Sequence, residues 1–126
     1  MKTISIAAGS EYQALLGVFS AAFNQASEGK GKDRHAKSDE PFEKQKICEI
    51  TRRVGLGFPL GQAIKKAEES LRLGHRGPAE ILGAINYLAA AYIVLQEETN
   101  HPPIADDPFF DAEELHKSGT HACENN

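Results

Sequence analysis

The chain contains no tryptophan, one methionine and two cysteines among its 126 residues. Cys48 and Cys123 lie far apart and without the close spacing of metal-binding motifs. We therefore expect free thiols in a cytoplasmic protein, with no disulfide scaffold and no metal site. A Gly-x-Ser-x-Gly elbow and a Walker loop are absent from the sequence, so we predict no catalytic residues. A basic-then-apolar leader is also absent, and we expect no secretion signal.

Long charge-free apolar runs are scarce as well. The longest, residues 81–95, is interrupted by Asn86, and we expect it to be too short to span a bilayer, with no membrane partner. The surrounding stretch Pro78–Gln96 is nevertheless apolar on nearly every side of a helix, and such a helix has to be covered nearly all round. One chain of this size offers few helices for that purpose. The sequence therefore predicts a homo-oligomer.

Wherever a hydrophobic period is clear, it is helical, which predicts an all-α fold. We expect a small bundle of four main helices around a central apolar helix, 78–97. The first helix covers about 10–28, the second follows a cap at Asp39 or Glu40, and the third opens at Pro59. The tight connection Gly74–Gly77 predicts an antiparallel hairpin of the third and fourth helices.

The remaining segments complete the predicted organisation. Residues 2–8 are expected to form an arm or edge strand, and residues 29–40 a mobile basic loop. We divide the chain into a helical domain, 1–100, and an acidic C-terminal extension, 101–126, with a short helix at 107–117.

Spacing also predicts which side of each helix is buried. The inner face of the first helix is expected to comprise Tyr12, Leu15, Leu16, Phe19, Ala22, Phe23 and Ala26. That of the second comprises Ile47, Ile50, Thr51 and Val54, with Cys48 nearby as a small core residue. That of the third comprises Leu60, Ala63, Ile64, Ala67 and Leu71. That of the fourth comprises Ile81, Leu82, Ile85, Leu88, Ala89, Tyr92 and Ile93. On the outer side of the third helix we expect the ion pairs Lys65–Glu69 and Glu68–Arg72.

Charge is distributed unevenly along the chain, whose net charge is −4. Residues 30–76 hold twelve of the fourteen Lys and Arg and seven acids, a balance of +5. Residues 97–126 hold eight acids and one Lys, a balance of −7. The basic centre predicts a small anionic ligand. Alternatively, the acidic tail folds over the basic face of its own chain or of a neighbour.

The candidate ligand site is built around the hairpin turn. His75 and Arg76 precede the N-terminus of the fourth helix, where free amides and the helix dipole favour anions. An aromatic ring, an amide and cations are what a nucleotide requires. The candidate ligand-binding residues are Lys30, Lys32, Arg34, His35, Lys65, Glu69, Arg72, His75, Arg76, Asn86 and Tyr87. The alternative is a plain turn with solvated charges.

Two resemblances accompany these features. The segment Gly57–Lys66, followed by Ala84–Leu88, resembles small helical proteins encoded by bacteriophages. Glu68, Glu69 and Glu80 are similar to part of the acidic pattern of MazG-like nucleotide pyrophosphohydrolases. That resemblance implies an all-α oligomer holding Mg²⁺ against a nucleoside triphosphate. In this sequence Arg72 stands where the third acid of that pattern belongs, and Gly83 follows Glu80 where its last acid belongs.

Three functions follow as expectations. The first is a non-enzymatic, phage-type accessory protein in the bacterial host cytoplasm, which binds an anionic nucleotide-like ligand as a homo-oligomer and sequesters a defence signal, without a cofactor. The second is a divergent MazG-like hydrolase using Mg²⁺ with Glu68, Glu69 and Glu80. The third is an inhibitor that presents its acidic tail, Asp106–Glu114, to a host protein. Binding of double-stranded DNA is not expected, because the net charge is negative and no DNA-reading motif is present.

Overall fold

The computed structural model describes residues 9–28 and 40–100, and every regular element in these two ranges is helical. This confirms the predicted all-α class. The elements are η1 (Ser10–Tyr12), α1 (Gln13–Glu28), η2 (Phe42–Lys44), α3 (Lys46–Val54), α4 (Gly57–Ser70), η3 (Gly74–Arg76) and α5 (Gly77–Asn100). The expected arm at 2–8, most of the basic loop, the helix at 107–117 and the rest of the acidic extension lie outside the described residues.

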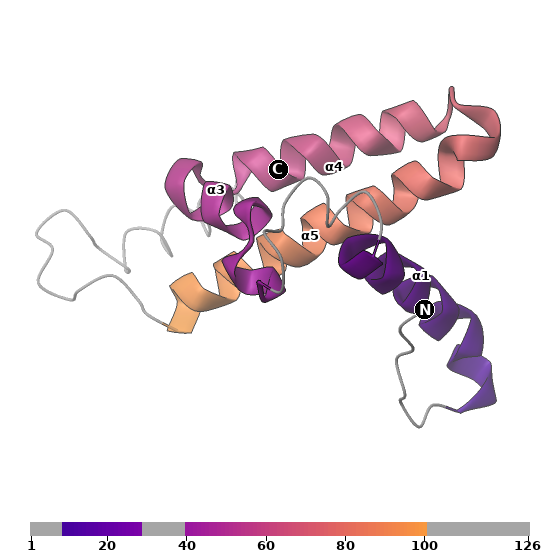
Figure 1. Cartoon of the computed structure of the whole chain (residues 1–126), viewed down its shortest axis with the longest axis horizontal. Coiled ribbons are helices and arrows are strands. Elements are labelled where there is room, and N and C mark those ends of the chain that lie inside the picture. The colour runs from indigo at the N-terminus through magenta and orange to yellow at the C-terminus, as the bar shows by residue number, and fades with distance from the viewer. Residues whose placement is uncertain (1–8, 29–39, 101–126) are drawn as a thin grey trace, which may run out of the picture.

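The centre of the molecule is the predicted antiparallel hairpin of α4 and α5, which pack along each other (Figure 1). Its turn is short because Gly74 adopts φ 54°, a left-handed conformation that glycine accepts without steric cost. The two backbones then approach closely, since a Cβ atom on Gly77 would lie 2.6 Å from the carbonyl oxygen of Ser70. The hairpin turn thus requires glycine for two different reasons.

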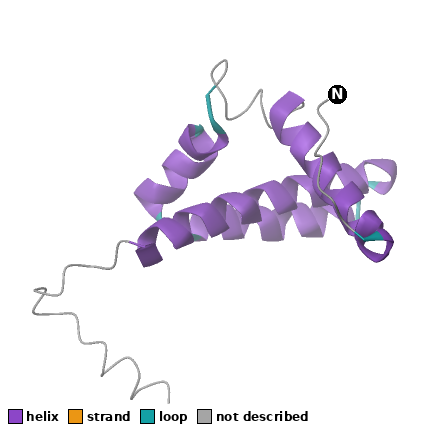
Figure 2. Ribbon diagram, turned by 90° about the horizontal axis from the view of Figure 1, so that it is seen from below, coloured by secondary structure: helices purple, strands orange, loops and turns teal. Residues whose placement is uncertain are grey.

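Both remaining helices lie on the same side of this hairpin, as Figure 2 shows. Helix α3 packs against both α4 and α5, whereas α1 crosses α5 (Figure 1). The side chain of Asn86 donates a hydrogen bond of 3.0 Å to the carbonyl oxygen of Ala22, which fixes α1 on α5. At the far end of α5, Arg52 of α3 forms two hydrogen bonds with Glu97, at 2.9 and 2.8 Å.

The core lies where α3, α4 and α5 meet, and most of its side chains are small. Its buried members are Ile47, Cys48, Ala63, Ala84, Tyr87, Ala90 and Val94. Phe58 packs the edge of its ring against Tyr87, with ring centroids 5.8 Å apart. Gly83 and Ala91 are also buried on α5. Small residues allow α4 and α5 to approach closely, but they bury little apolar area per residue.

Several predicted inner faces are wrong. In α5 the buried side is formed by Gly83, Ala84, Tyr87, Ala90, Ala91 and Val94, while Leu88 and Tyr92, expected inside, are 48% and 65% exposed. In α4 only Ala63 of the predicted face is buried, because the helix is rotated by about a quarter of a turn relative to the expectation. Val54 of α3 is exposed as well, whereas Ile47, Thr51 and Cys48 are buried as predicted.

Helix α1 departs furthest from its predicted packing, since Ala22 is its one buried residue. Tyr12, Leu15, Phe19 and Phe23 were all expected inside, and each is exposed by 41% or more. The crossing geometry explains this result, because a helix that crosses its neighbour covers only the residues at the crossing. The large apolar side chains of α1 are therefore accessible in the single chain.

The continuous helical stretch Gly74–Asn100 has 27 residues and is apolar enough to cross a membrane by length and composition. The expectation that the apolar segment is too short to span a bilayer considered only residues 81–95. In the structure α4 lies along α5 and carries Lys65, Lys66, Glu68 and Glu69. Insertion of α5 would therefore require its separation from α4 or the burial of these charges in lipid.

Candidate functional site

The best candidate site is the turn end of the α4–α5 hairpin, where three basic residues lie close together in the chain. Arg72 follows α4, and His75 and Arg76 belong to η3. All three are exposed. None of their side chains has an ion-pair partner among the residues that the structure describes. They therefore form a local excess of positive charge at one end of the molecule.

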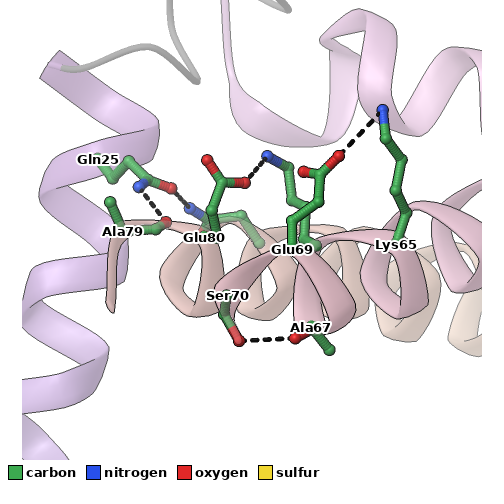
Figure 3. A network of polar contacts seen from close by, with 9 residues as sticks. Gln25, Lys65, Ala67, Glu69, Ser70, Ala79 and Glu80 are labelled. Atoms are coloured by element: carbon green, nitrogen blue, oxygen red, sulfur yellow. Dashed lines mark hydrogen bonds and ion pairs between the residues drawn. The ribbon is translucent and has the colours of Figure 1, made fainter. Parts of the chain in front are cut away.

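The acidic residue closest to this turn along α5 is already neutralised. Glu80, in the first turn of α5, forms an ion pair with Lys66 of α4, with 2.9 Å between Oε2 and Nζ, as Figure 3 shows. Both side chains are largely buried, with exposures of 13% for Lys66 and 24% for Glu80. The stem of Lys66 lies over Gly83, where a Cβ atom would stand 2.9 Å from the Cδ of Lys66. Glu80 is thus occupied within the hairpin and does not offset the cations at the turn.

Lys65 and Glu69 lie one turn apart on α4, on the same side as Glu80, and their side chains form the predicted ion pair at 3.8 Å (Figure 3). Lys65 is 64% exposed, so this pair contributes little to stability. The second predicted pair, Glu68 with Arg72, does not form between these two described residues. Arg72 consequently keeps its charge available to solvent or to a ligand.

The structure places Asn86 and Tyr87 away from the basic turn. Asn86 faces α1, where it contacts Ala22 and Gln25. Tyr87 is 7% exposed and belongs to the core, about 16 Å along the axis of α5 from Arg76. Its ring is already packed against Phe58. Neither side chain lies beside the turn cations in this single chain.

The candidate residues Lys30, Lys32, Arg34 and His35 lie outside the described residues. Within the described part of the chain, no three His, Cys, Asp or Glu side chains are grouped so that they could hold a metal ion. Glu69 and Glu80, which the MazG-like pattern would use for Mg²⁺, are both paired with lysines. Glu68 is exposed. The geometry of the described residues therefore offers no argument for hydrolysis.

Sequence reasoning missed two charged contacts that shape this region. The pair Lys66–Glu80 could have been predicted from the hairpin, because residues at equal distances on either side of the turn of an antiparallel hairpin lie opposite each other. Arg52–Glu97 had none, since 45 positions separate its members. Arg52 also donates a hydrogen bond to the backbone carbonyl of Glu43, and the bond with Glu97 raises the pKa of its guanidinium.

The only free cysteine that the described residues contain, Cys48, lies in the core. Burial raises the pKa of its thiol, which keeps it protonated and unreactive at neutral pH. Nucleophilic chemistry at this position would require opening of the core. We accordingly assign Cys48 a packing role.

Comparison with known proteins adds no assignment to this geometry, because no protein-family model, curated protein or solved structure matches the chain.

Proposed function

We propose that this chain is a non-enzymatic binding protein which, as a homo-oligomer, holds an anionic nucleotide-like ligand at the turn of its α4–α5 hairpin. One observation carries the proposal: Arg72, His75 and Arg76 are exposed at the turn without an acidic partner among the described residues. Guanidinium groups form charge-assisted, often bidentate hydrogen bonds with phosphate oxygens. The cluster is therefore suited to a phosphate group.

The surroundings of the turn support the same ligand class. The pairing of Glu80 with Lys66 removes the negative charge that would otherwise stand in the first turn of α5. The helix dipole at the start of α5 then acts in the same direction as the three basic side chains. The resemblance to small phage-encoded helical proteins favours sequestration of a nucleotide signal of bacterial defence, in the host cytoplasm, as the role of such binding.

The test is calorimetric titration of the full chain with a panel of linear and cyclic nucleotides. We expect at least one nucleotide to bind, and charge reversal in Arg72→Glu or Arg76→Glu to weaken its binding at least tenfold. The matched control is Arg53→Glu on α3, a cation 77% exposed near the other end of α5, which should change the affinity by less than about twofold. Absence of binding across the panel would reject the proposal, as would equal losses in all three variants.

A further inference from the structure

The α4–α5 hairpin has one covered side and one bare side. α1 and α3 both lie on the covered side (Figure 2), where α5 reaches them through Asn86 and Glu97. The opposite side carries large apolar side chains that the described residues cover only in part. They are Leu60 and Ile64 of α4, Leu71 directly after α4, and Ile81, Leu88, Tyr92 and Leu95 of α5. We call these seven residues the bare face.

The bare face has the regular spacing of a helix-packing seam. On α4 its positions, together with Ala67, are 60, 64, 67 and 71, which are separated by four, three and four residues. On α5, together with the half-buried Ile85, they are 81, 85, 88, 92 and 95, which alternate steps of four and three. This alternation is the pattern of helices that pack side by side at a small crossing angle. Two such stripes on adjacent antiparallel helices make one half of a four-helix bundle.

We propose that the bare face binds the bare face of a second copy of this chain, so that two α4–α5 hairpins form a four-helix bundle. The inference gives the homo-oligomer of the proposed function its interface, and it rests on that part of the proposal. A two-fold axis makes the contact self-complementary, because each subunit offers the same residues to the other. In that arrangement α1 and α3 of each subunit lie on the outer sides of the bundle.

The area of the bare face matches the needs of a stable dimer. Its seven side chains are between 42% and 87% exposed in the single chain. Because six of the seven are Leu or Ile, we take about 150 Å² for each, the lower end of the range for aromatic side chains, and the exposed fractions then amount to roughly 600 Å² of surface. Standard protein interfaces bury about 800 Å² per partner, of which little more than half is apolar. A monomer seldom leaves a patch of this size uncovered.

The charge of the bare face favours a second copy of the chain over two other occupants, the acidic C-terminal segment and a membrane surface. Residues 81–96 of α5 contain no charged side chain, so the α5 half of the face has no electrostatic complement for the acidic segment 97–126, with its eight acids. Helices that lie on membrane surfaces carry mainly Lys and Arg along the edge of their apolar side, whereas α5 carries no charge over this length and the exposed charges beside the α4 stripe, Lys65, Glu68 and Arg72, are of both signs. An identical uncharged face is complementary in both shape and polarity.

Sedimentation equilibrium of the full chain tests the proposal. We expect the wild-type mass to be twice the chain mass of 13.7 kDa. Because a two-fold interface contains each substitution twice, Leu88→Glu and Ile64→Glu should each raise the dimer dissociation constant at least a hundredfold. The matched control is Val54→Glu on α3, which is 68% exposed and should leave the mass unchanged. Far-ultraviolet circular dichroism checks that each variant keeps its helices.

A labelling experiment gives an answer even where a glutamate variant fails to fold. In a Cys123→Ser background, Leu88→Cys and Val54→Cys place thiols at positions that are exposed in the single chain. The dimer should slow reagent attack at position 88 at least tenfold relative to position 54, and dilution should abolish the difference. Equal labelling rates at high concentration would overturn the proposal. A wild-type mass of one chain would also overturn it, as would dissociation by Phe19→Glu on α1 but not by Leu88→Glu.

The nucleotide titration separates the two proposals. If Leu88→Glu is monomeric and still binds the nucleotide, the interface stands and the ligand site is complete within one chain. If the wild type is dimeric but binds no nucleotide, the interface stands and the ligand assignment fails. If the wild type is monomeric and binds a nucleotide, the interface fails and the ligand assignment stands.

Discussion

The substitution Gly77→Ala tests the close approach on which the hairpin turn depends. Gly77 has helical dihedral angles, φ −53° and ψ −50°, and in such a position alanine is normally favoured over glycine by about 1 kcal/mol. Here, however, the added Cβ atom would stand 2.6 Å from the carbonyl oxygen of Ser70. That oxygen belongs to the backbone, so it moves only if the end of α4 moves with it.

The magnitude follows from these two opposing terms. Forcing one extra methyl group into a packed contact destabilises the fold by about 1–3 kcal/mol, and the higher helix propensity of alanine offsets about 1 kcal/mol of this loss. We expect a net loss of about 1 kcal/mol in the free energy of unfolding. The matched control is Gly61→Ala in α4, where a Cβ atom would meet nothing within 4 Å. This variant should gain about 0.5–1 kcal/mol.

Urea denaturation followed by circular dichroism, at one fixed protein concentration, measures both variants. The expected difference between them is about 2 kcal/mol in the free energy of unfolding. Equal stabilisation by both substitutions would refute the close approach of α4 to the start of α5. The turn cations would then lie in a wider connection than the structure shows.

Three further predictions concern stability. Arg52→Ala removes both hydrogen bonds to Glu97 and should lower the free energy of unfolding by about 1–2 kcal/mol. The lower figure is expected, because both side chains are more than a third exposed to solvent. The control Arg53→Ala, measured by the same urea titration, should leave the free energy of unfolding almost unchanged. Burial raises the pKa of Cys48 in the folded state. The thiol's contribution to stability is therefore complete below the ordinary thiol pKa of about 8.5 and is lost as the pH rises from that value through the folded-state pKa. Above about pH 8.5, the urea midpoint should fall faster with pH in wild type than in Cys48→Ala. If association stabilises the fold, the wild-type Tm should rise with protein concentration, whereas that of Leu88→Glu should not.

Much of the secondary structure was predictable because proline and glycine mark its boundaries. Pro59 and Pro78 lie in the first turns of α4 and α5, and Gly55 and Gly74 adopt positive φ values between helices. The helical period between these markers is clear, so the class and the hairpin followed from the sequence alone. The expected start of the second helix, after a cap at Asp39 or Glu40, is wrong: α3 begins at Lys46 after Gln45, because residues 42–44 form the separate 3₁₀ helix η2. The ends of the first and fourth helices differ from the expectations by three residues or fewer.

Helix orientation was not predictable in the same way. A helix that is apolar on every side, as α5 is, has several stripes that satisfy helical spacing, and spacing alone does not rank them. Choosing the stripe with the largest side chains placed Leu88 and Tyr92 inside. The structure instead buries Ala84, Ala90 and Ala91 together with Tyr87 and Val94, because a tight hairpin turn holds α4 close to α5 and small residues fit most of that contact.

The same error in orientation explains how far the candidate site was predictable. The cations Arg72, His75 and Arg76 belong to a turn, whose position depends on glycine and not on helix phase, and their exposure followed from the sequence. Asn86 and Tyr87 depend on the phase of α5. One step of about 100° per residue along a helix is enough to turn such a side chain from a solvent-facing position into the core.

The buried side of α5 carries mostly small residues and its exposed side carries large ones, and this distribution limits the hydrophobic stabilisation of the single chain. A core of three alanines with Ile47, Cys48, Tyr87 and Val94 buries little apolar area, and buried apolar area is the main source of stabilisation. The side chains with the greatest capacity for burial, such as Tyr92 and Leu71, are 65% and 87% exposed in the single chain. A chain with this distribution gains most of its remaining hydrophobic stabilisation only on association. We therefore expect folding and assembly to be thermodynamically coupled, with the α4–α5 hairpin as the element that both processes share.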